Sequence, residues 1–296
     1  MKFGTMAIVG CPNVGKSTLV NRLVNQKIAI VSDKPQTTRS RILGVAHFPE
    51  GQLALLDTPG LHRAWHRLNK RMVRAALDTV HEADLLAVMV DGRQMPGAGD
   101  RIVINQIFSM PDRTKDLPIF LLVNKVDVIS KPKVLPVIDA YQSLGEWAEI
   151  IPLSAKTGIN VDRLRELVFA RFSDEEGSAY DDDFVTDQSL RRLAAETIRE
   201  KVLEQTKAEL PYAVAVTIDE FVEKEKLFSI AASIMVERSG QKAIIIGKGG
   251  ARLKEIGTSA RLDLEREMGV KVFLDLHVKV KEAWRDNESL LVDLGY

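Results

Sequence analysis

Short apolar segments alternate with amphipathic segments over the first 172 residues of the chain. The apolar segments are rich in Val, Ile and Leu, and each is followed by a polar or Gly/Pro turn. They occupy residues 6–10, 53–57, 85–91, 119–124 and 150–154. Apolar residues at helical spacing predict helices between them, for example over residues 16–25, 70–81 and 161–172. Strands that are apolar on both faces and separated by helices indicate an α/β fold, in which helices cover both faces of a mostly parallel sheet.

The order of elements changes beyond residue 188, where strands follow one another directly. The elements predicted there are a helix at 189–207, strands at 214–218 and 228–236, a short apolar stretch at 243–246, a helix from 251 to about 268 and a strand at 270–280. This α-β-β-α-α-β order predicts an α+β domain with a three-stranded sheet.

An acidic, polar segment separates the two patterns and predicts a linker at residues 173–187. The predicted domains are therefore 1–172 and 188–296, the second ending in a C-terminal helix. The chain has 41 Lys and Arg against 41 Asp and Glu, yet residues 1–172 carry a net charge of +7 and the remainder −7. Within the acidic part, residues 238–261 contain six basic side chains and one acidic one. Net neutrality therefore does not exclude a nucleic-acid partner.

Composition excludes several classes of protein. The single cysteine, Cys11, argues against a disulfide-stabilised scaffold and suits a reducing compartment. The sequence contains no run of 18 apolar residues, and no long apolar stretch precedes a cleavage site near its start. We therefore expect a cytoplasmic protein.

Residues 10–17, GCPNVGKS, fit the pattern G-x-x-x-x-G-K-[ST] between a predicted strand and a predicted helix. Glycines let consecutive backbone N–H groups face a polyphosphate, and the helix N-terminus adds partial positive charge. Lys16 is expected to reach the β- and γ-phosphates and Ser17 to bind Mg²⁺. The phosphate contacts predicted from this loop are Gly10, Cys11, Pro12, Asn13, Val14, Gly15, Lys16, Ser17 and Thr18.

A second motif, DTPG at 57–60, ends the next predicted strand. Asp57 is expected to hold Mg²⁺ through water and Gly60 to present its N–H group to the γ-phosphate. One of the two threonines in the polar loop before it, Thr38 in preference to Thr37, is expected to complete the magnesium site when the γ-phosphate is bound, which makes a switch. The phosphate contacts predicted from this motif are Asp57, Thr58, Pro59, Gly60 and Leu61.

Leu61 occupies the position at which many regulatory GTPases carry a glutamine that positions the attacking water. A leucine side chain cannot hydrogen-bond water, so the sequence predicts slow intrinsic hydrolysis. Backbone groups, a partner or a monovalent cation such as K⁺ near Asn13 would then order the water.

Two further motifs select the base. Asp127 of NKVD can accept hydrogen bonds from N1–H and the 2-amino group of guanine, which adenine cannot offer. Ser154-Ala155-Lys156 ends the following strand, where the Ala155 N–H group can donate to the guanine 6-keto oxygen. The predicted guanine contacts are Asn124, Lys125, Val126, Asp127, Ser154, Ala155 and Lys156. This pair of motifs argues against a P-loop ATPase or a small-molecule kinase.

The second domain carries a Gly-rich loop, GKGG at 247–250, before a long helix. Glycines on both sides of a two-residue tip let the backbone approach a phosphodiester, and an adjacent apolar groove can hold single-stranded bases. This pattern is typical of KH-type recognition of about four nucleotides. The predicted RNA contacts are Lys242, Ile246, Gly247, Lys248, Gly249, Gly250, Arg252 and Lys254.

These motifs together resemble the Era family of bacterial GTPases. The segments that carry the resemblance are GCPNVGKSTLVN, SDKPQTTRSRILG, DTPGLH, NKVD, SAKTG, the REK and ELPY segments at 199–201 and 209–212, and IIIGKGGARLKEIG. The resemblance extends from Thr5 to about Glu282. It implies a P-loop GTPase domain followed by a type II KH domain.

The resemblance also implies what the protein binds and does. The expected ligands are GTP and GDP, with Mg²⁺ as cofactor, and the monovalent cation considered above for the Leu61 position would be K⁺. The expected partners are single-stranded RNA near the 3′ end of 16S rRNA and the 30S ribosomal subunit, whose assembly and maturation the protein would assist. Peripheral association with the inner membrane is reported for the family, and no stable protein partner is predicted.

Two other functions remain open at this stage. The chain could be a membrane-surface signalling GTPase that couples growth or the cell cycle to its GTP state, with RNA binding secondary. A tRNA-modifying GTPase is less favoured, because the chain length leaves no additional catalytic domain.

Overall fold

The computed structural model describes residues 1–34, 37–61, 67–110, 114, 116–174, 177–206, 210 and 213–296. Parts of three predicted motifs lie outside this range, namely residues 35–36, His62, and residues 209 and 211–212 of the ELPY segment. The chain forms two compact units, which we describe separately. Unit 1 comprises Met1–Ala29, Thr38–Trp65 and Asn69–Asp187, and unit 2 comprises Ile30–Thr37, His66–Leu68 and Gln188–Tyr296.

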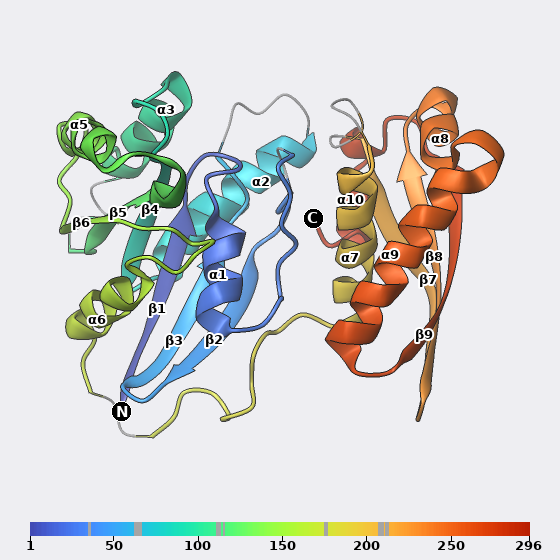
Figure 1. The fold of residues 1–296 in the computed structure, drawn as a ribbon, viewed down its shortest axis with the longest axis horizontal. Coiled ribbons are helices and arrows are strands. Elements are labelled where there is room, and N and C mark those ends of the chain that lie inside the picture. The colour runs from blue at the N-terminus through green and yellow to red at the C-terminus, as the bar shows by residue number, and fades with distance from the viewer. Residues whose placement is uncertain are drawn as a thin grey trace. The chain divides into compact units, whose positions relative to one another are not determined.

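Unit 1 contains a six-stranded sheet with the order β2-β3-β1-β4-β5-β6, in which only the β2–β3 pair is antiparallel (Figure 1). Its strands are β1 Lys2–Val9, β2 Ile42–Phe48, β3 Gly51–Asp57, β4 Leu85–Asp91, β5 Ile119–Asn124 and β6 Glu149–Pro152. Its helices are α1 Lys16–Val24, α2 Arg67–Asp78, α3 Ala98–Phe108, α5 Lys131–Gln142 and α6 Val161–Arg171, with short 3₁₀ helices η1 Thr79–Glu82 and η2 Val126–Val128. The predicted α/β fold with a mostly parallel sheet is confirmed.

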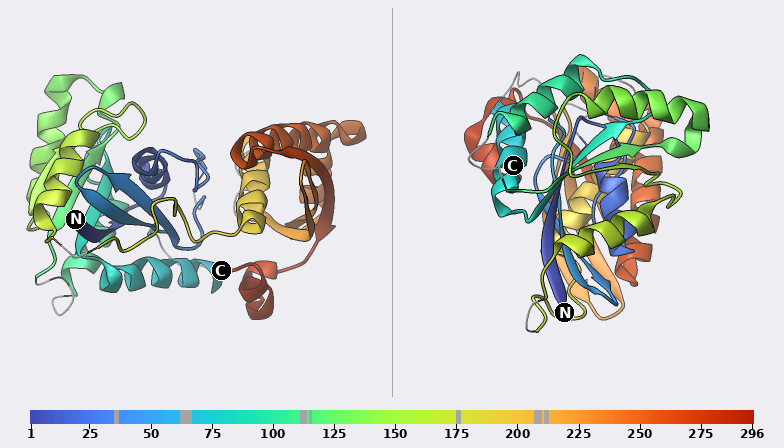
Figure 2. Two further views of the ribbon diagram at one scale, coloured as in Figure 1. Left: turned by 90° about the horizontal axis from the view of Figure 1, so that it is seen from below. Right: turned by 90° about the vertical axis from the view of Figure 1, so that its left-hand side faces the viewer.

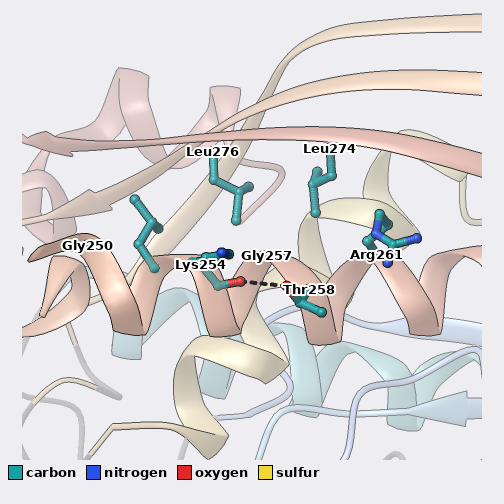
Figure 3. Close-up of a pocket in the computed structure, with 8 residues that line it drawn as sticks. Gly250, Lys254, Gly257, Thr258, Arg261, Leu274 and Leu276 are labelled. Carbon is teal, nitrogen blue, oxygen red and sulfur yellow. Dashed lines mark hydrogen bonds between the residues drawn. The ribbon is translucent and has the colours of Figure 1, made fainter.

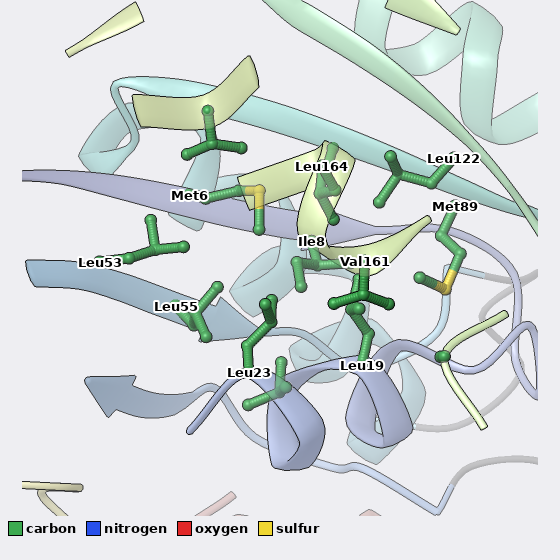
Figure 4. Close-up of a cluster of buried hydrophobic side chains, with 14 of the residues drawn as sticks. Met6, Ile8, Leu19, Leu23, Leu53, Leu55, Met89, Leu122, Val161 and Leu164 are labelled. Carbon is green, nitrogen blue, oxygen red and sulfur yellow. The ribbon is translucent and has the colours of Figure 1, made fainter. Parts of the chain in front are cut away.

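Two hydrophobic clusters, one on each face of this sheet, explain why its strands are apolar throughout. Met6 and Ile8 of β1 pack in the cluster that contains α1 and α6 side chains, drawn in Figure 4. Ala7 and Val9, which alternate with them, pack in the other cluster with α3 and α5. Because successive strand residues point to opposite faces, a strand covered on both sides shows no polar positions.

The sequence pattern gave no residue range for three elements of unit 1, namely β2, α3 and α5. Strand β2, ILGVAHF, contains a glycine and ends beside the exposed His47, so its apolar run is interrupted. It pairs antiparallel with β3 through a tight connection, which places it at the edge of the sheet. Helices α3 and α5 carry polar and proline residues that weaken their apolar periodicity.

The predicted linker lies in unit 1 and is not a free tether. The Val45 N–H group of β2 donates to the Val185 carbonyl at 2.8 Å, and Thr186 Oγ1 donates to the Leu43 carbonyl at 2.6 Å. The Tyr180 ring stacks on Phe184, with centroids 5.1 Å apart. The end of the segment therefore runs along edge strand β2, and the main part of unit 2 begins at Gln188, directly after the predicted linker.

Unit 2 has the predicted order α-β-β-α-α-β, and Figure 2 shows its helices and strands in two further views. Its elements are α7 Leu190–Glu204, β7 Ala215–Lys224, β8 Leu227–Val236, α8 Ser239–Ile246, η3 Lys248–Gly250, α9 Ala251–Met268, β9 Lys271–Val280, η4 Trp284–Asp286 and α10 Glu288–Asp293. Strand β8 pairs antiparallel with β7 and parallel with β9. Ile198 of α7 and Ile256 and Ala260 of α9 pack on the sheet and are fully buried. The apolar stretch predicted at 243–246 forms the end of α8.

Within the described part of the chain, none of the helices has both the length and the apolar composition needed to cross a membrane.

Candidate functional site: a phosphate loop, a base loop and a groove beside helix α9

The phosphate loop connects β1 to α1 and depends on two glycines. Gly10 has φ +153°, and a Cβ there would lie 2.2 Å from the Met89 carbonyl oxygen. Gly15 has φ +109°, and a Cβ there would lie 2.2 Å from Asn124 Nδ2. Both positions combine a backbone conformation that disfavours side chains with a neighbour that leaves no room. The loop is therefore held against the ends of β4 and β5.

Lys16 is the first residue of α1 and is 6% exposed. Its Nζ donates to the carbonyl oxygens of Gly10 at 3.3 Å and Cys11 at 3.0 Å. Burial lowers the pKa of Lys16, while the nearby Asp57 carboxylate acts in the opposite direction. A polyphosphate beside this ammonium group would favour its charged form, so the site is suited to an anion.

Ser17, Thr38 and Asp57, the three residues predicted to position magnesium, lie together in the structure. Ser17 Oγ donates to Asp57 Oδ2 at 2.6 Å and lies 2.9 Å from Thr38 Oγ1. The other carboxylate oxygen, Asp57 Oδ1, is buried and has no hydrogen-bond partner among the described residues. Burial raises the pKa of this carboxyl, and a divalent cation would oppose that shift. Two hydroxyls and a carboxylate with an unpartnered oxygen fit Mg²⁺, which prefers oxygen ligands.

The residues after Asp57 hold the DTPG segment against β1 and the phosphate loop, through hydrogen bonds and through packing. Thr58 Oγ1 donates to the Ile8 carbonyl at 2.7 Å, and the Leu61 N–H group donates to the Gly10 carbonyl at 3.1 Å. Pro59 and Gly60 are buried between them. The Leu61 side chain is 2% exposed and packs in the hydrophobic cluster of α3 and α5. Leu61 thus fixes the start of its loop against the phosphate loop.

We expect Leu61→Gln to destabilise the protein without accelerating GTP hydrolysis. The amide would be buried among apolar side chains, so the free energy of unfolding should fall by about 2–4 kcal/mol. Thermal unfolding and single-turnover hydrolysis of the variant measure the two effects. A faster chemical step in a stably folded variant would contradict the packing role of Leu61.

The base loop, which carries the NKVD motif at residues 124–127, is hydrogen-bonded to the phosphate loop through its first two residues. Asn124 Nδ2 donates to the Val14 carbonyl at 2.7 Å, and Asn124 Oδ1 accepts from the Ala155 N–H group at 2.9 Å. Lys125 Nζ donates to the Asn13 carbonyl at 2.6 Å. Three segments that are distant in sequence therefore meet at the carboxyl ends of β1, β5 and β6, the edge at which open α/β sheets bind ligands.

Arg22 of helix α1, which the sequence did not identify as a site residue, holds the SAK segment through hydrogen bonds. Arg22 Nε donates to the Ala155 carbonyl at 2.5 Å, and its Nη2 donates to the carbonyl of Lys156. Ser154 is fully buried, and its Oγ accepts from the Thr157 N–H group at 3.1 Å. The Ala155 N–H group, predicted to donate to guanine, already donates to Asn124, so a guanine 6-keto oxygen would have to share it.

Asp127 and Val126 lie in η2, directly after the NKVD lysine, and both are half-buried. The Val126 N–H group donates to the Leu153 carbonyl at 3.3 Å, which anchors this short helix to the end of β6. The Asp127 carboxylate is thereby carried on a segment with a fixed backbone.

Cys11 is half-buried in the phosphate loop and is a free thiol. Burial, together with the Asp100 carboxylate at the start of α3, raises the pKa of this thiol to about 12. A thiol that stays protonated is a poor nucleophile. Cys11 therefore serves the loop as a small, neutral side chain.

The second site is a groove between α9 and the edge strand β9, with a cavity volume of about 390 Å³. Figure 3 shows α9 on one side and the leucines of β9 on the other. The lining residues are Gly250, Leu253, Lys254, Gly257, Thr258, Arg261, Leu274 and Leu276. A Cβ at Gly257 would lie 3.4 Å from Leu276 Cδ1, in ordinary van der Waals contact, and would fill space at the middle of the groove.

The structure places the predicted RNA-binding residues in two groups. Gly250 and Lys254 line the groove. The others lie on α8, at the exposed tip of the GKGG loop or in the first turn of α9, namely Lys242, Ile246, Gly247, Lys248, Gly249 and Arg252. The Arg252 guanidinium donates to the Ile244 carbonyl at the end of α8, so it braces the loop.

Six of the groove residues were not predicted as RNA contacts. For the four of them that lie on α9, the spacing along the sequence could have identified a shared helix face. Positions 250, 253, 254, 257, 258 and 261 repeat at helical intervals of three and four, which defines one face of α9. A second face, with Ile256, Ala260 and Leu264, packs in the core. A helix with two such faces presents one to the core and one to a ligand.

Comparison with known proteins identifies a matching family for each part of the chain. The family model described as the 50S ribosome-binding GTPase matches residues 5–125, and the KH domain model matches residues 209–285. GTPase Era of Geobacter metallireducens is 48% identical over 296 residues, covering 99% of this chain and 97% of that protein. GTPase Era of Heliobacterium modesticaldum is 44% identical over 299 residues, covering 100% and 97%.

Two solved structures share the whole fold. A variant of Era from Aquifex aeolicus bound to GDP·AlF4⁻ is 40% identical, with a TM-score of 0.94 and coverage of 100% of this chain and 99% of that one. The same values describe Era in complex with MgGDPNP and nucleotides 1506–1542 of 16S ribosomal RNA. Since relatives this similar align over the full length, the chain belongs to the Era family of GTPases, with a GTP-hydrolysing domain followed by a KH domain.

Proposed function

We propose that this GTPase binds single-stranded RNA near the 3′ end of 16S rRNA in the groove between α9 and β9. The observation that carries the proposal is that groove, which pairs an apolar wall with basic side chains beside a Gly-rich loop. A related Era has been solved with nucleotides 1506–1542 of 16S rRNA. Binding there would place the protein in the assembly and maturation of the 30S subunit, in the cytoplasm.

The chemistry of the groove suits unpaired bases. Leu253, Leu274 and Leu276 offer apolar surface for base faces, and Gly257 lets a base approach the helix backbone. Lys254 and Arg261 supply positive charge for the phosphodiester, although Arg261 also pairs with Glu265 at 3.1 Å. Few cations line the groove, so we expect a narrow electrostatic footprint.

In unit 1 we propose that the phosphate loop and Lys16 hold the phosphates of GTP and that Asp127 selects guanine. Ser17, Thr38 and Asp57 would hold Mg²⁺, directly or through water, which neutralises charge on the β- and γ-phosphates when it is bound. The buried Leu61 side chain leaves the attacking water to backbone groups, a partner or K⁺ near Asn13.

Removing the two cations of the groove tests the RNA proposal. We expect Lys254→Ala combined with Arg261→Ala to weaken binding of a 16S 3′-end oligonucleotide by about tenfold or more. The salt slope should also fall by about 0.7 for each phosphate that the protein no longer neutralises. Fluorescence anisotropy over a range of salt concentrations measures both quantities.

Arg266→Ala provides the matched control, because Arg266 lies on the same helix, is 77% exposed and does not line the groove. Equal loss of affinity in the control would contradict the assignment of the groove. Cross-linking in cells then tests the biological target. Recovery of no small-subunit rRNA, with co-sedimentation on anionic vesicles, would favour the membrane-surface alternative.

A further inference from the structure

The carboxylate of Asp91 joins two loops of the nucleotide site although it belongs to none of the motifs. Asp91 is the last residue of β4, and its Oδ2 accepts from Lys125 Nζ at 2.8 Å. The same Nζ donates to the Asn13 carbonyl at 2.6 Å. The side chains of Asp91 and Lys125 are 9% and 25% exposed, so water screens this ion pair only in part.

The position of the Asp91 carboxylate is itself fixed. Arg93 donates to Oδ1 from its backbone N–H group at 3.0 Å and to Oδ2 from Nη2 at 2.7 Å. The Gly92 N–H group donates to the Asn124 carbonyl at 2.8 Å, which joins the end of β4 to the base loop. Burial alone would raise the pKa of Asp91, but hydrogen bonds from Arg93 and Lys125 lower it to about 2. The carboxylate is therefore ionised throughout the neutral range.

Lys125 and Asn13, which are joined by the hydrogen bond from the ammonium group to the carbonyl, both have unusual backbone conformations. Lys125 has φ +70° and Asn13 has φ +63°, in the left-handed region that costs non-glycine residues free energy. Such conformations persist where neighbouring contacts fix them. The ammonium group of Lys125 supplies one such contact to the phosphate loop, and Asp91 holds that group in place.

We propose that Asp91 is a positioning residue for nucleotide binding. By holding Lys125 against the Asn13 carbonyl, it would set the affinity for the guanine nucleotide without touching the nucleotide. The proposal rests on the assignment of Lys125 and the phosphate loop to the nucleotide site. It concerns binding rather than the chemical step, so it predicts a change in KM with little change in kcat.

The test uses the full chain and four variants, namely Asp91→Asn, Lys125→Ala, their combination, and Asp139→Asn. We expect Asp91→Asn to raise the Kd for GDP and the KM for GTP by about 10- to 100-fold, as for the loss of a hydrogen bond between charged groups. The kcat should stay within about twofold of wild type, because no group that contacts the phosphates has changed. Since Asp91 acts through Lys125, the double variant should bind no more weakly than Lys125→Ala alone.

Asp139→Asn is the matched control, because it makes the same substitution at an exposed position of α5. Its KM should remain near that of wild type, and an equal rise would overturn the proposal. Additive effects of Asp91→Asn and Lys125→Ala, or a loss in kcat at unchanged KM, would also overturn it. If Lys125→Ala leaves GDP affinity intact, the nucleotide-site assignment itself is wrong. If only Asp91→Asn lacks an effect, this inference alone fails.

A thermal unfolding curve for each variant separates binding from folding. Should Asp91→Asn not fold, Asp91→Glu keeps the charge and alters only its reach. A raised KM with wild-type kcat in that variant supports the positioning role, whereas wild-type KM rejects it.

Discussion

Asp127→Asn should convert the preference for GTP into a preference for XTP. The amide would donate toward the 2-position of the base, where guanine carries an amino donor and xanthine carries a keto acceptor. Sites built on such hydrogen bonds discriminate by about 10⁴-fold or more, so GTP affinity should fall by several orders of magnitude. Competition of unlabelled GTP and XTP against a fluorescent nucleotide measures the change for both proteins.

The fixed backbone around Asp127 is the reason to expect a change in selectivity rather than a general loss. The segment is anchored to the end of β6 through the Val126 N–H group. Asp139→Asn, an exposed substitution of the same kind on α5, serves as the control. Unchanged GTP preference in Asp127→Asn would refute the guanine assignment, as would equal weakening toward every purine nucleotide.

Lys16→Ala should reduce GTP hydrolysis at saturating GTP by about 10²–10³-fold, as for the loss of one preorganised group at the transferring phosphate. Lys16 is buried at the start of α1, where its ammonium group is fixed by hydrogen bonds to the carbonyls of Gly10 and Cys11. Lys16→Arg should recover little activity, because the planar guanidinium is larger and needs different partners. Phosphate release under single-turnover conditions measures the chemical step.

Lys133→Ala, which removes an exposed lysine of α5, should hydrolyse GTP at the wild-type rate. If Lys16→Ala kept more than about a tenth of the wild-type rate, the main electrostatic contribution would have to lie elsewhere. Backbone N–H groups of the phosphate loop would then be the next candidates.

The parallel strands, the phosphate loop and the base loop could be recognised from the sequence, because each depends on a few consecutive residues. Strand β5 begins and ends as predicted, and α9 ends at Met268. In contrast, β2 was missed because Gly44 and His47 interrupt its apolar run and its partner is set by the neighbouring strand β3. Edge strands often carry charged or polar residues, which protect the unpaired edge from pairing with other chains.

The supporting residues of the site could not be predicted from sequence, because they act through contacts between distant segments. Arg22 holds the carbonyl of Ala155, 133 residues away, and Asp91 holds Lys125, 34 residues away. Neither position has a local pattern that distinguishes it from an ordinary surface charge. The groove residues of α9 differ in this respect, since their helical spacing is readable once two faces are considered separately.

The segment along β2 has a consequence for preparing unit 1 by itself. A chain that stops at residue 172 would leave the backbone N–H and carbonyl groups of Val45 and Leu43 without the partners that Val185 and Thr186 provide. Exposed edge strands of this kind pair with other molecules and promote aggregation. A chain that continues to Asp187 keeps the segment that hydrogen-bonds to the edge strand β2. It should remain monomeric at concentrations where the shorter chain precipitates.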